Sequence, residues 1–320
     1  MVHKSFSTSS SIKGSHKLFR LLIVTILLGT TVAILVFFVL QTSFHGNMPS
    51  YDSTLDYRTD SPSIEGGPNI EEKPAVEFAE INFQPLVDDF VNSTQGDKGV
   101  LIYDLDLQKN VGEYNPDSSF STASLYKLFV VYEGYRRLDR GEWDGNEFLG
   151  AAGHTVLECL DLAIRESNSS CAETLWSKIG RSELDRIIIN DFGIVNTEVS
   201  AFKSTPSDIL KVMKLFYDHP DISSDGLVSR MQDSFLVQPK TEYDWRQGLP
   251  SGFIKANVYN KVGWDYNPGS KYWNIYNDAA IVEFPENDRH FIVAVMTSRV
   301  SFEKISELGA RIEDLVYTSH

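Results

Sequence analysis

The segment Ser124-Leu125-Tyr126-Lys127 places a hydroxyl and an amine at a spacing that suits nucleophilic catalysis. In a helix, residues three apart lie on one face, so the Lys127 amine can sit beside the Ser124 hydroxyl and accept its proton. Burial and the positive end of a helix dipole both favour the neutral amine that a general base requires. The first backbone N–H groups of the same helix would stabilise an oxyanion. The pair therefore predicts a serine nucleophile that is activated without a histidine.

The Ser-x-x-Lys pattern occurs at four serines, so context must select among them: Ser10, Ser124, Ser200 and Ser301. Ser10 lies in a serine-rich tail, Ser200 in a loop without a hydrophobic pattern, and Ser301 where a helix N-cap is expected. Only Ser124 joins an extended segment to a long apolar helix. The structural alternative is that Ser124 caps this helix while Lys127 extends its ammonium to solvent. The seven histidines lie in tails or beside turn residues, so a histidine-based triad is not expected.

The N-terminal part predicts a membrane anchor. Residues 21–40 are uncharged and almost wholly apolar, and about 20 such residues cross the hydrocarbon core as a helix. The charged residues before them are all cations, which places the N-terminus inside the cell. A cleaved signal peptide is the alternative, but it would have a shorter apolar core followed by a small-residue cleavage site. We therefore expect a cytoplasmic tail at 1–20, a single transmembrane helix at 21–40, and the remainder outside the cell.

The pattern of the chain changes again after the membrane segment. Residues 41–76 are rich in Ser, Pro, Gly, Asp and Glu and lack periodicity, which predicts a flexible linker. Residues 77–320 carry strand patterns at both ends and helix patterns between them. The expected strands are 99–105, 111–114, 258–262, 272–284 and 290–297, and the expected helices are 81–91, 124–138, 155–166, 170–179, 205–216 and 301–316. This order predicts an α/β (α+β) domain, with an antiparallel β-sheet formed from both ends, flanking helices and an inserted all-helical lobe.

Charge and cysteine content limit the possible functions. The formal net charge is −15, of which four cations before residue 21 contribute +4, so the rest carries −19. Such an acidic domain is unsuited to nucleic acid or anionic lipid. We find neither a metal-ligand cluster nor a phosphate-binding loop and expect no metal or cofactor, and we expect a monomer. Cys159 and Cys171 can form a disulfide outside the cell, the alternative being two buried thiols.

Two further segments follow Ser124 along the chain: Ser167-Asn168-Ser169 and Lys261-Val262-Gly263-Trp264. With Ser124 and Lys127, their order resembles the signature of class A β-lactamases and penicillin-binding proteins, which is Ser-x-x-Lys, Ser-Asp-Asn and Lys-Thr-Gly. The likeness covers the chain from about Phe83 onward. Taken singly, Ser167 could be a helix cap and Lys261 a solvated charge on a strand.

The resemblance implies roles for four catalytic residues. Ser124 would attack an amide carbonyl, and Lys127 would accept its proton. Ser167 would relay a proton to the leaving nitrogen, and Lys261 would assist that relay and attract the substrate carboxylate. The backbone N–H groups of Ser124 and Trp264 would form the oxyanion hole.

The resemblance also implies the residues that surround these groups. Substrate contacts would come from Ser169, Gly263 and Trp264. In one branch of the family, a cysteine after the middle motif pairs with one in the preceding helix, a placement that Cys171 and Cys159 match.

The chain departs from the family in several places. Asn168 and Ser169 replace aspartate and asparagine, and Val262 replaces a threonine whose hydroxyl would face the substrate carboxylate. Between residues 193 and 205, the family has a loop whose glutamate activates the deacylating water. This chain is shorter there, and Glu198 is its only carboxylate, among neighbours that do not match.

Three functional interpretations follow. The first is a membrane-anchored class A β-lactamase-type serine hydrolase that forms an acyl-enzyme with β-lactam or D-Ala-D-Ala-like amides and deacylates slowly. The second is a D,D-peptidase-like penicillin-binding protein acting on cell-wall peptide. The third is a non-catalytic cell-wall-binding domain of the same fold, favoured by the substitutions at Asn168, Ser169 and Val262.

Overall fold

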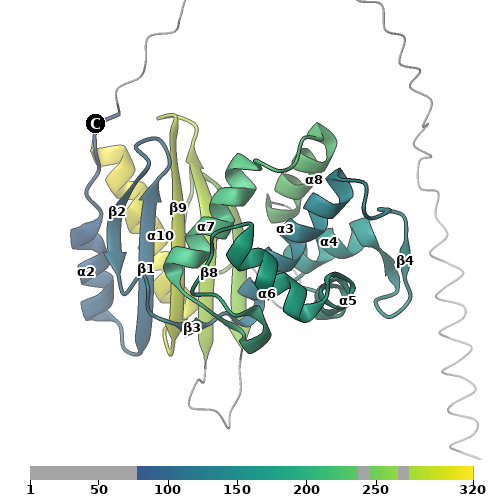
Figure 1. Cartoon of the computed structure of the whole chain (residues 1–320). Helices are drawn as coiled ribbons and strands as arrows, with labels where there is room; N and C mark the ends of the chain where they lie inside the picture. Colours follow the sequence, from purple (N-terminus) through teal and green to yellow (C-terminus); the bar gives the residue numbers. More distant parts are fainter. Residues whose placement is uncertain (1–77, 237–245, 266–273, 320) are drawn as a thin grey trace, which may run out of the picture. The chain divides into compact units, whose positions relative to one another are not determined.

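Strands from the two ends of the domain form one five-stranded antiparallel sheet (Figure 1). The structure is a computed structural model that describes residues 78–236, 246–265 and 274–319. The strand order is β2-β1-β9-β8-β7. The strands are β1 Asp97–Asp104, β2 Lys109–Tyr114, β7 Asn257–Asp265, β8 Ile275–Phe284 and β9 Arg289–Ser298. Because β1 pairs with β9, the two ends of the domain meet at the centre of the sheet, and the predicted fold class is confirmed.

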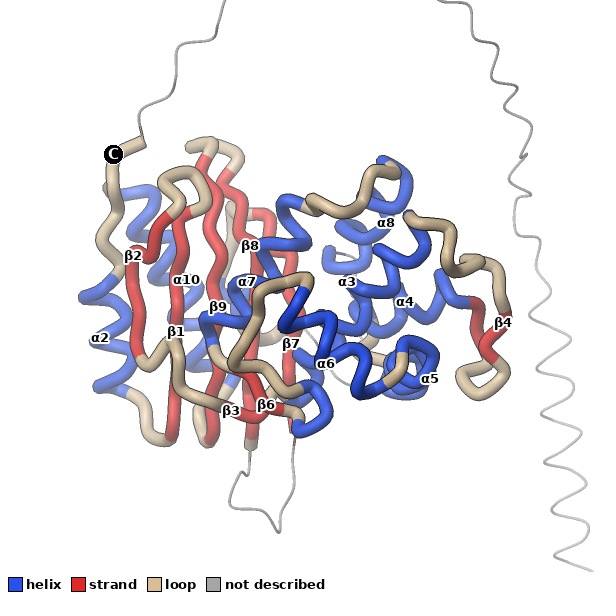
Figure 2. The backbone as a smooth tube through the Cα atoms, in the orientation of Figure 1, coloured by secondary structure: helices blue, strands red, loops and turns tan. Residues whose placement is uncertain are grey.

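Alternation along the central strands produces an apolar cluster on each face of the sheet. On β1, Val100 and Ile102 belong to one cluster and Leu101 to the other, because successive side chains of a strand point to opposite faces. The first cluster includes residues of α2 (Gln84–Ser93), α9 (Leu249–Gly252) and α10 (Phe302–Thr318). The second joins the sheet to the helical lobe, which Figure 2 shows on the other side of the sheet.

The helical lobe is built around α3 (Tyr126–Asp139), which is buried throughout Tyr126–Arg136. The surrounding helices are α4 Val156–Arg165, α5 Ser169–Ile179, α6 Arg181–Asn190, α7 Pro206–Asp218 and α8 Asp225–Leu236. The predicted capping box at Thr155 is confirmed, since its hydroxyl accepts from the Glu158 N–H and the Glu158 carboxylate from the Thr155 N–H. Thr205 caps α7 as predicted, with proline in the first turn. Two-stranded ribbons complete the lobe: β3 Phe120–Ser121 with β6 Lys203–Ser204, and β4 Phe148–Leu149 with β5 His154–Thr155.

Two predicted helix starts differ from the structure. The helix expected from residue 124 begins at Tyr126, because Ser124 lies in a preceding 3-10 turn, η1 (Ala123–Leu125). The helix expected from residue 81 begins at Gln84, which places Pro85 in the first turn, where a backbone N–H would have no partner within the helix.

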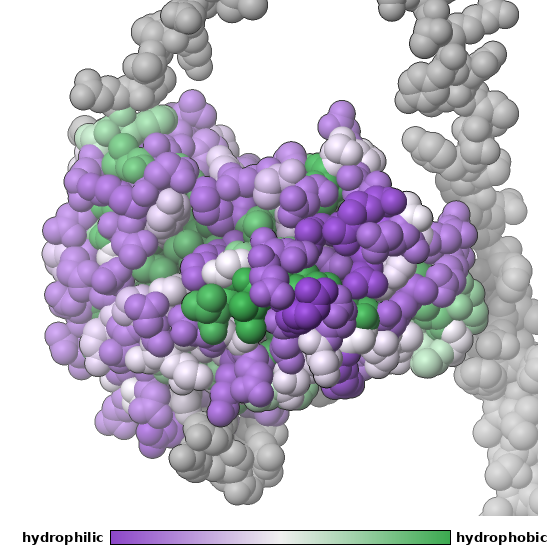
Figure 3. Space-filling model, in the orientation of Figure 1, coloured by the Kyte–Doolittle hydropathy of each residue, from purple (hydrophilic) through white to green (hydrophobic). Residues whose placement is uncertain are grey.

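The predicted tail, membrane helix and linker lie outside the described residues. Within the described ranges, no helix combines the length and apolarity needed to cross a bilayer. The face in Figure 3 is mostly hydrophilic, with small separate apolar patches.

Candidate active site

The sheet holds the segment that precedes Ser124 in place. Asn277 on β8 donates from Nδ2 to the carbonyl oxygens of Ser121, at 2.8 Å, and Thr122, at 3.1 Å. Ala123 follows with a φ of +43°, a left-handed conformation that is uncommon for a residue with a side chain. A strained backbone conformation persists only where the surrounding structure holds it in place, and such positions are frequent at functional sites. Ser124 itself is half-buried.

Strand β7 passes directly beside this turn. A Cβ built on Gly263 would lie 3.2 Å from the backbone nitrogen of Leu125 and closer still to the Thr122 carbonyl oxygen. Glycine is required for so close an approach between two backbones. The contact brings the strand that carries Lys261 against the turn that carries Ser124.

Two buried lysines converge on one hydroxyl. Lys127 is fully buried, and its Nζ donates to the Ser167 carbonyl oxygen, to the Ser167 Oγ at 3.2 Å and to the Ser169 Oγ at 3.1 Å. Lys261 is also fully buried, and its Nζ donates to the Ser167 Oγ at 3.0 Å and to the Val262 carbonyl oxygen at 2.7 Å. The Ser167 hydroxyl therefore lies between two amines that come from different parts of the chain.

The start of α5 orients this hydroxyl. Ser167 has a φ of +54°, and Asn168 caps the helix by accepting from the Cys171 backbone N–H at 3.0 Å. A disulfide between Cys159 and Cys171, with Cα atoms 4.7 Å apart, joins this first turn to α4. The cap and the disulfide hold the turn from which Ser167 and Ser169 reach Lys127.

Residues 82–319 match the model of the beta-lactamase enzyme family. The chain belongs to this family. Among solved structures, a variant of the last common ancestor of Gram-negative bacteria β-lactamase class A has a TM-score of 0.61 at 16% identity, over 74% of this chain and 100% of its own. A β-lactamase from Xanthomonas campestris pv. campestris has a TM-score of 0.62 at 14% identity, over 72% and 96% of the two chains. No curated protein matches the sequence. At these identities the structural likeness establishes the serine β-lactamase fold.

The structural alternatives for three residues of the family motifs are wrong. Lys127 does not extend to solvent, and Lys261 is not a solvated charge. Ser167 is not the cap of α5, because Asn168 has that position. The two lysines instead occupy the interior of the domain, where unpaired polar groups are costly and persist only with partners, and Ser167 is half-buried beside them.

Burial sets the protonation of the two lysines. It lowers the pKa of Lys127 from its usual 10.5 to about 7, while the Glu173 carboxylate acts in the opposite direction. Burial also lowers the pKa of Lys261 well below its usual range, the Lys127 charge lowers it further, and the Asp278 carboxylate opposes both. A lysine with a pKa near 7 supplies a neutral amine at physiological pH, and this lone pair can accept a proton from a hydroxyl.

Two residues predicted to contact substrate, Ser169 and Trp264, lie in different environments, as does Val262. Ser169 contacts the Lys127 amine, so its hydroxyl belongs to the lysine cluster. Trp264 is partly buried and pairs with Tyr276 on β8. Val262 packs in the apolar cluster shared with α9 and α10.

The remaining candidates from the sequence lie elsewhere in the described chain. Glu198 is exposed, and its backbone pairs with that of Lys203. Ser200 is exposed in the 3-10 turn η2 (Val199–Ala201). Ser301 caps α10 by accepting from the Lys304 N–H, as predicted. Ser10 lies outside the described residues.

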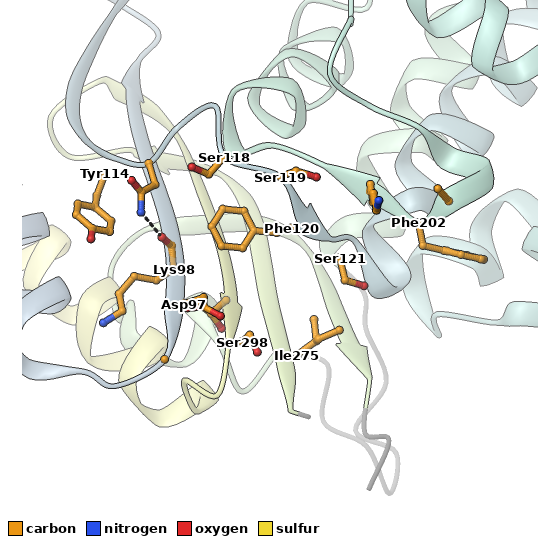
Figure 4. Close-up of a pocket in the computed structure, with 15 residues that line it drawn as sticks. Asp97, Lys98, Tyr114, Ser118, Ser119, Phe120, Ser121, Phe202, Ile275 and Ser298 are labelled. Atoms are coloured by element: carbon orange, nitrogen blue, oxygen red, sulfur yellow. Dashed lines mark hydrogen bonds between the residues drawn. The ribbon is translucent and has the colours of Figure 1, made fainter. Parts of the chain in front are cut away.

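A cavity of about 560 Å³ lies beside the Ser124 turn (Figure 4). Its walls include Ser121, three residues before Ser124, together with the rings of Phe120 and Phe202 and the end of β9. The side chain of Lys98 points away from it and donates to the carbonyl oxygens of Val91 and Thr94. The residues of the lysine cluster do not line this cavity, so the two features are separate.

Three buried polar residues of the sheet were not predicted as part of the site. Asn260, Asn277 and Asp278 are fully buried on strands β7 and β8. Asn277 anchors the Ser124 turn, and Asn260 donates to Asp278 at 2.9 Å. The sequence did contain a signal for them. A polar side chain at a buried strand position is tolerated only with a specific hydrogen-bond partner, so these residue types indicate such partners.

Proposed function

We propose that this protein is a membrane-anchored, extracytoplasmic serine hydrolase that forms an acyl-enzyme with β-lactam or D-Ala-D-Ala-like amides. The observation that carries the proposal is the Ser167 hydroxyl held between two buried amines, beside the turn that presents Ser124. Residues 21–40 would be the anchor, with the N-terminus inside the cell.

The groups of the cluster support a balanced acylation step. The Ser124 oxygen attacks the carbonyl carbon as its proton passes to the neutral Lys127 amine. The tetrahedral oxyanion is stabilised by backbone N–H groups, including that of Trp264. When the C–N bond breaks, Ser167 gives its proton to the leaving nitrogen and is reprotonated by one of the two lysines. The result is a Ser124 ester and a free amine.

Deacylation is proposed to be slow. Among the described residues, the acceptors of the Lys127 amine are a carbonyl and two hydroxyls. Glu198 is exposed, and the Glu173 carboxylate already accepts from the Tyr126 hydroxyl and pairs with Arg181. Among the described residues, we therefore assign neither Glu198 nor Glu173 as the carboxylate that would activate a water molecule for deacylation.

Incubation of the purified full chain with a reporter penicillin and a chromogenic cephalosporin tests the proposal. We expect a covalent adduct by intact-protein mass spectrometry, with little turnover, and no adduct for Ser124→Ala. Rapid sustained hydrolysis would instead indicate efficient deacylation. If no Ser124-dependent adduct forms with any probe, the non-catalytic interpretation is correct.

A further inference from the structure

The cavity beside the Ser124 turn has no role in the proposed reaction. Its volume of about 560 Å³ lies within the roughly 300–1,000 Å³ range of small-molecule sites. Its walls come from the neighbouring ends of β1 and β9, from residues 114–121 and from residues 201–203 (Figure 4). Because the lysine cluster does not line it, a ligand can occupy this cavity while a substrate reacts at Ser124.

One buried hydroxyl faces the cavity without a protein partner. Ser298 ends β9 and is 7% exposed. Met296, two residues earlier, belongs to the apolar cluster on the face of the helical lobe. Because side chains alternate along a strand, Ser298 points to the same face, and there it lines the cavity. Its Oγ makes no hydrogen bond to any residue that the structure describes, and a buried polar group in that position favours a ligand that supplies one.

Phe120 gives the cavity a fixed apolar surface. Its backbone pairs with that of Ser204 in the β3–β6 ribbon. A Cβ built on Gly99 would lie 2.6 Å from Cε2 of the Phe120 ring, so this ring rests directly on the backbone of β1. The ring is half-buried, and in Figure 4 it reaches in among the other lining side chains. A ring that is already held in place loses little conformational freedom when a ligand stacks on it.

The other polar groups of the cavity are mainly hydroxyls. The three serines of residues 118–121 line it, and their Oγ atoms have no hydrogen-bond partner within the described ranges. Of the charged residues, Asp97 and Lys203 are exposed and opposite in sign, and the amine of Lys98 points away. The cavity therefore offers an aromatic surface and several free hydroxyls, but no buried charge to pair with an ionic ligand.

We propose that this cavity binds a neutral pyranose ring of a carbohydrate. One face of a pyranose presents C–H groups, which pack on an aromatic ring such as Phe120. The hydroxyls around its edge need partners that both donate and accept, and serine hydroxyls do both. A charged ligand would lose hydration here without gaining a buried counter-ion.

The cell-wall glycan is the source of carbohydrate that fits this position, a choice that rests on the proposed function. The Phe202 carbonyl oxygen, in the cavity wall, accepts from the Thr122 N–H at 2.9 Å. Ser121, also in the wall, precedes Ser124 by three residues. The same short segment therefore borders the cavity and carries the nucleophile, so a glycan held here and the peptide attached to it can belong to one substrate.

Isothermal titration calorimetry of the full chain with chitotetraose, an oligomer of N-acetylglucosamine, tests the inference. We expect saturable binding by the wild type and by Ser124→Ala. Phe120→Leu keeps apolar volume but removes the ring, and should weaken binding about tenfold or more, as for other aromatic anchors. Ser298→Ala should weaken it about twofold to tenfold, the effect of one hydrogen bond. Phe148→Leu is the matched control, because this exposed ring on β4 lies outside the cavity, and should bind as the wild type does.

A blocking variant keeps the test independent of changes in the core. Ser119 is exposed in the cavity wall, so Ser119→Trp should leave thermal unfolding unchanged while its indole fills the space and abolishes binding. Maltotetraose, which has pyranose rings without acetamido groups, separates the two sources of carbohydrate. Equal affinity for both oligomers would overturn the choice of the cell-wall glycan.

Two results would overturn the site itself. One is the absence of saturable chitotetraose binding, and the other is binding that Phe120→Leu, Ser298→Ala and Ser119→Trp all leave unchanged. Absence of a Ser124-dependent adduct with the antibiotic probes would count against the proposed function. The oligosaccharide titration would still decide whether the cavity binds carbohydrate, because it requires no reaction at Ser124.

Discussion

The Oγ of Ser167 lies 3.0 Å from the Nζ of Lys261, on a strand 94 residues further along the chain. The same Oγ lies 3.2 Å from the Lys127 amine, so a single hydroxyl connects both lysines. Ser167→Ala removes the connection and leaves two buried amines without that partner. We expect acylation by a reporter penicillin to slow about 10²–10⁴-fold, the range typical for loss of a general acid–base group. Stopped-flow measurement of adduct formation checks this.

Ser169→Ala is the matched control for Ser167→Ala. The substitution removes a hydroxyl two residues away from Ser167, at the start of α5, and this hydroxyl contacts only the Lys127 amine. We expect a smaller loss of rate. Equal losses for the two variants would show that the connection between the lysines has no special role.

The acylation rate should depend on pH through Lys127. Burial lowers its pKa to about 7, and the reaction requires the neutral amine. Above pH 7 the amine is mostly free and the rate should reach a plateau. Below pH 7 protonation removes the base, and the rate should fall about tenfold per pH unit. The measurement is the initial rate of adduct formation between pH 5 and 9, and a rate that is flat across pH 7 would contradict the assignment.

The sheet could be predicted from the sequence, but the Ser124 turn could not. Strand patterns at both ends of the domain are local signals, and the antiparallel sheet follows from them. The 3-10 turn at Ala123–Leu125 depends on Asn277, which binds the Thr122 carbonyl from 155 residues away. No local pattern reports such a contact. Helix α6, by contrast, was missed although Leu184, Ile187 and Ile188 have helical spacing, because only Gly180 separates it from α5.

The residue types of the site could be predicted, but not their arrangement. The order of the three motifs indicates Ser124, Lys127, Ser167 and Lys261. That Ser167 lies between the amines depends on its positive φ and on the cap made by Asn168, which follow from the folding of the turn before α5. The family's aspartate at position 168 would be an equally good cap, so this substitution retains a structural role.

Loss of the disulfide should reduce stability. Cys159 and Cys171 are 12 residues apart, and closing a loop of that size stabilises a protein by about 3 kcal/mol, chiefly by restricting the unfolded chain. Cys159→Ala/Cys171→Ala should lower the free energy of unfolding in urea by that amount. The folded fraction should still form the adduct, because the cap at Asn168 remains. Titration of the unfolded, unreduced wild type should find no free thiol, and two reactive thiols would contradict the bond.

Gly263→Ala should separate strand β7 from the Ser124 turn. The new methyl group would lie 2.5 Å from the Thr122 carbonyl oxygen, a distance that requires the backbone to move. We expect a loss of about 1–3 kcal/mol in unfolding free energy, as for other overpacked sites. Acylation should also slow. Lys261 lies on the strand that would move and Ser124 on the turn against which it packs, so the movement would change the distance between the two residues. Gly150→Ala is the control, since nothing lies within 4 Å of its added Cβ. If Gly263→Ala acylates at the wild-type rate, close contact between the two backbones is not what aligns the nucleophile with the lysine cluster.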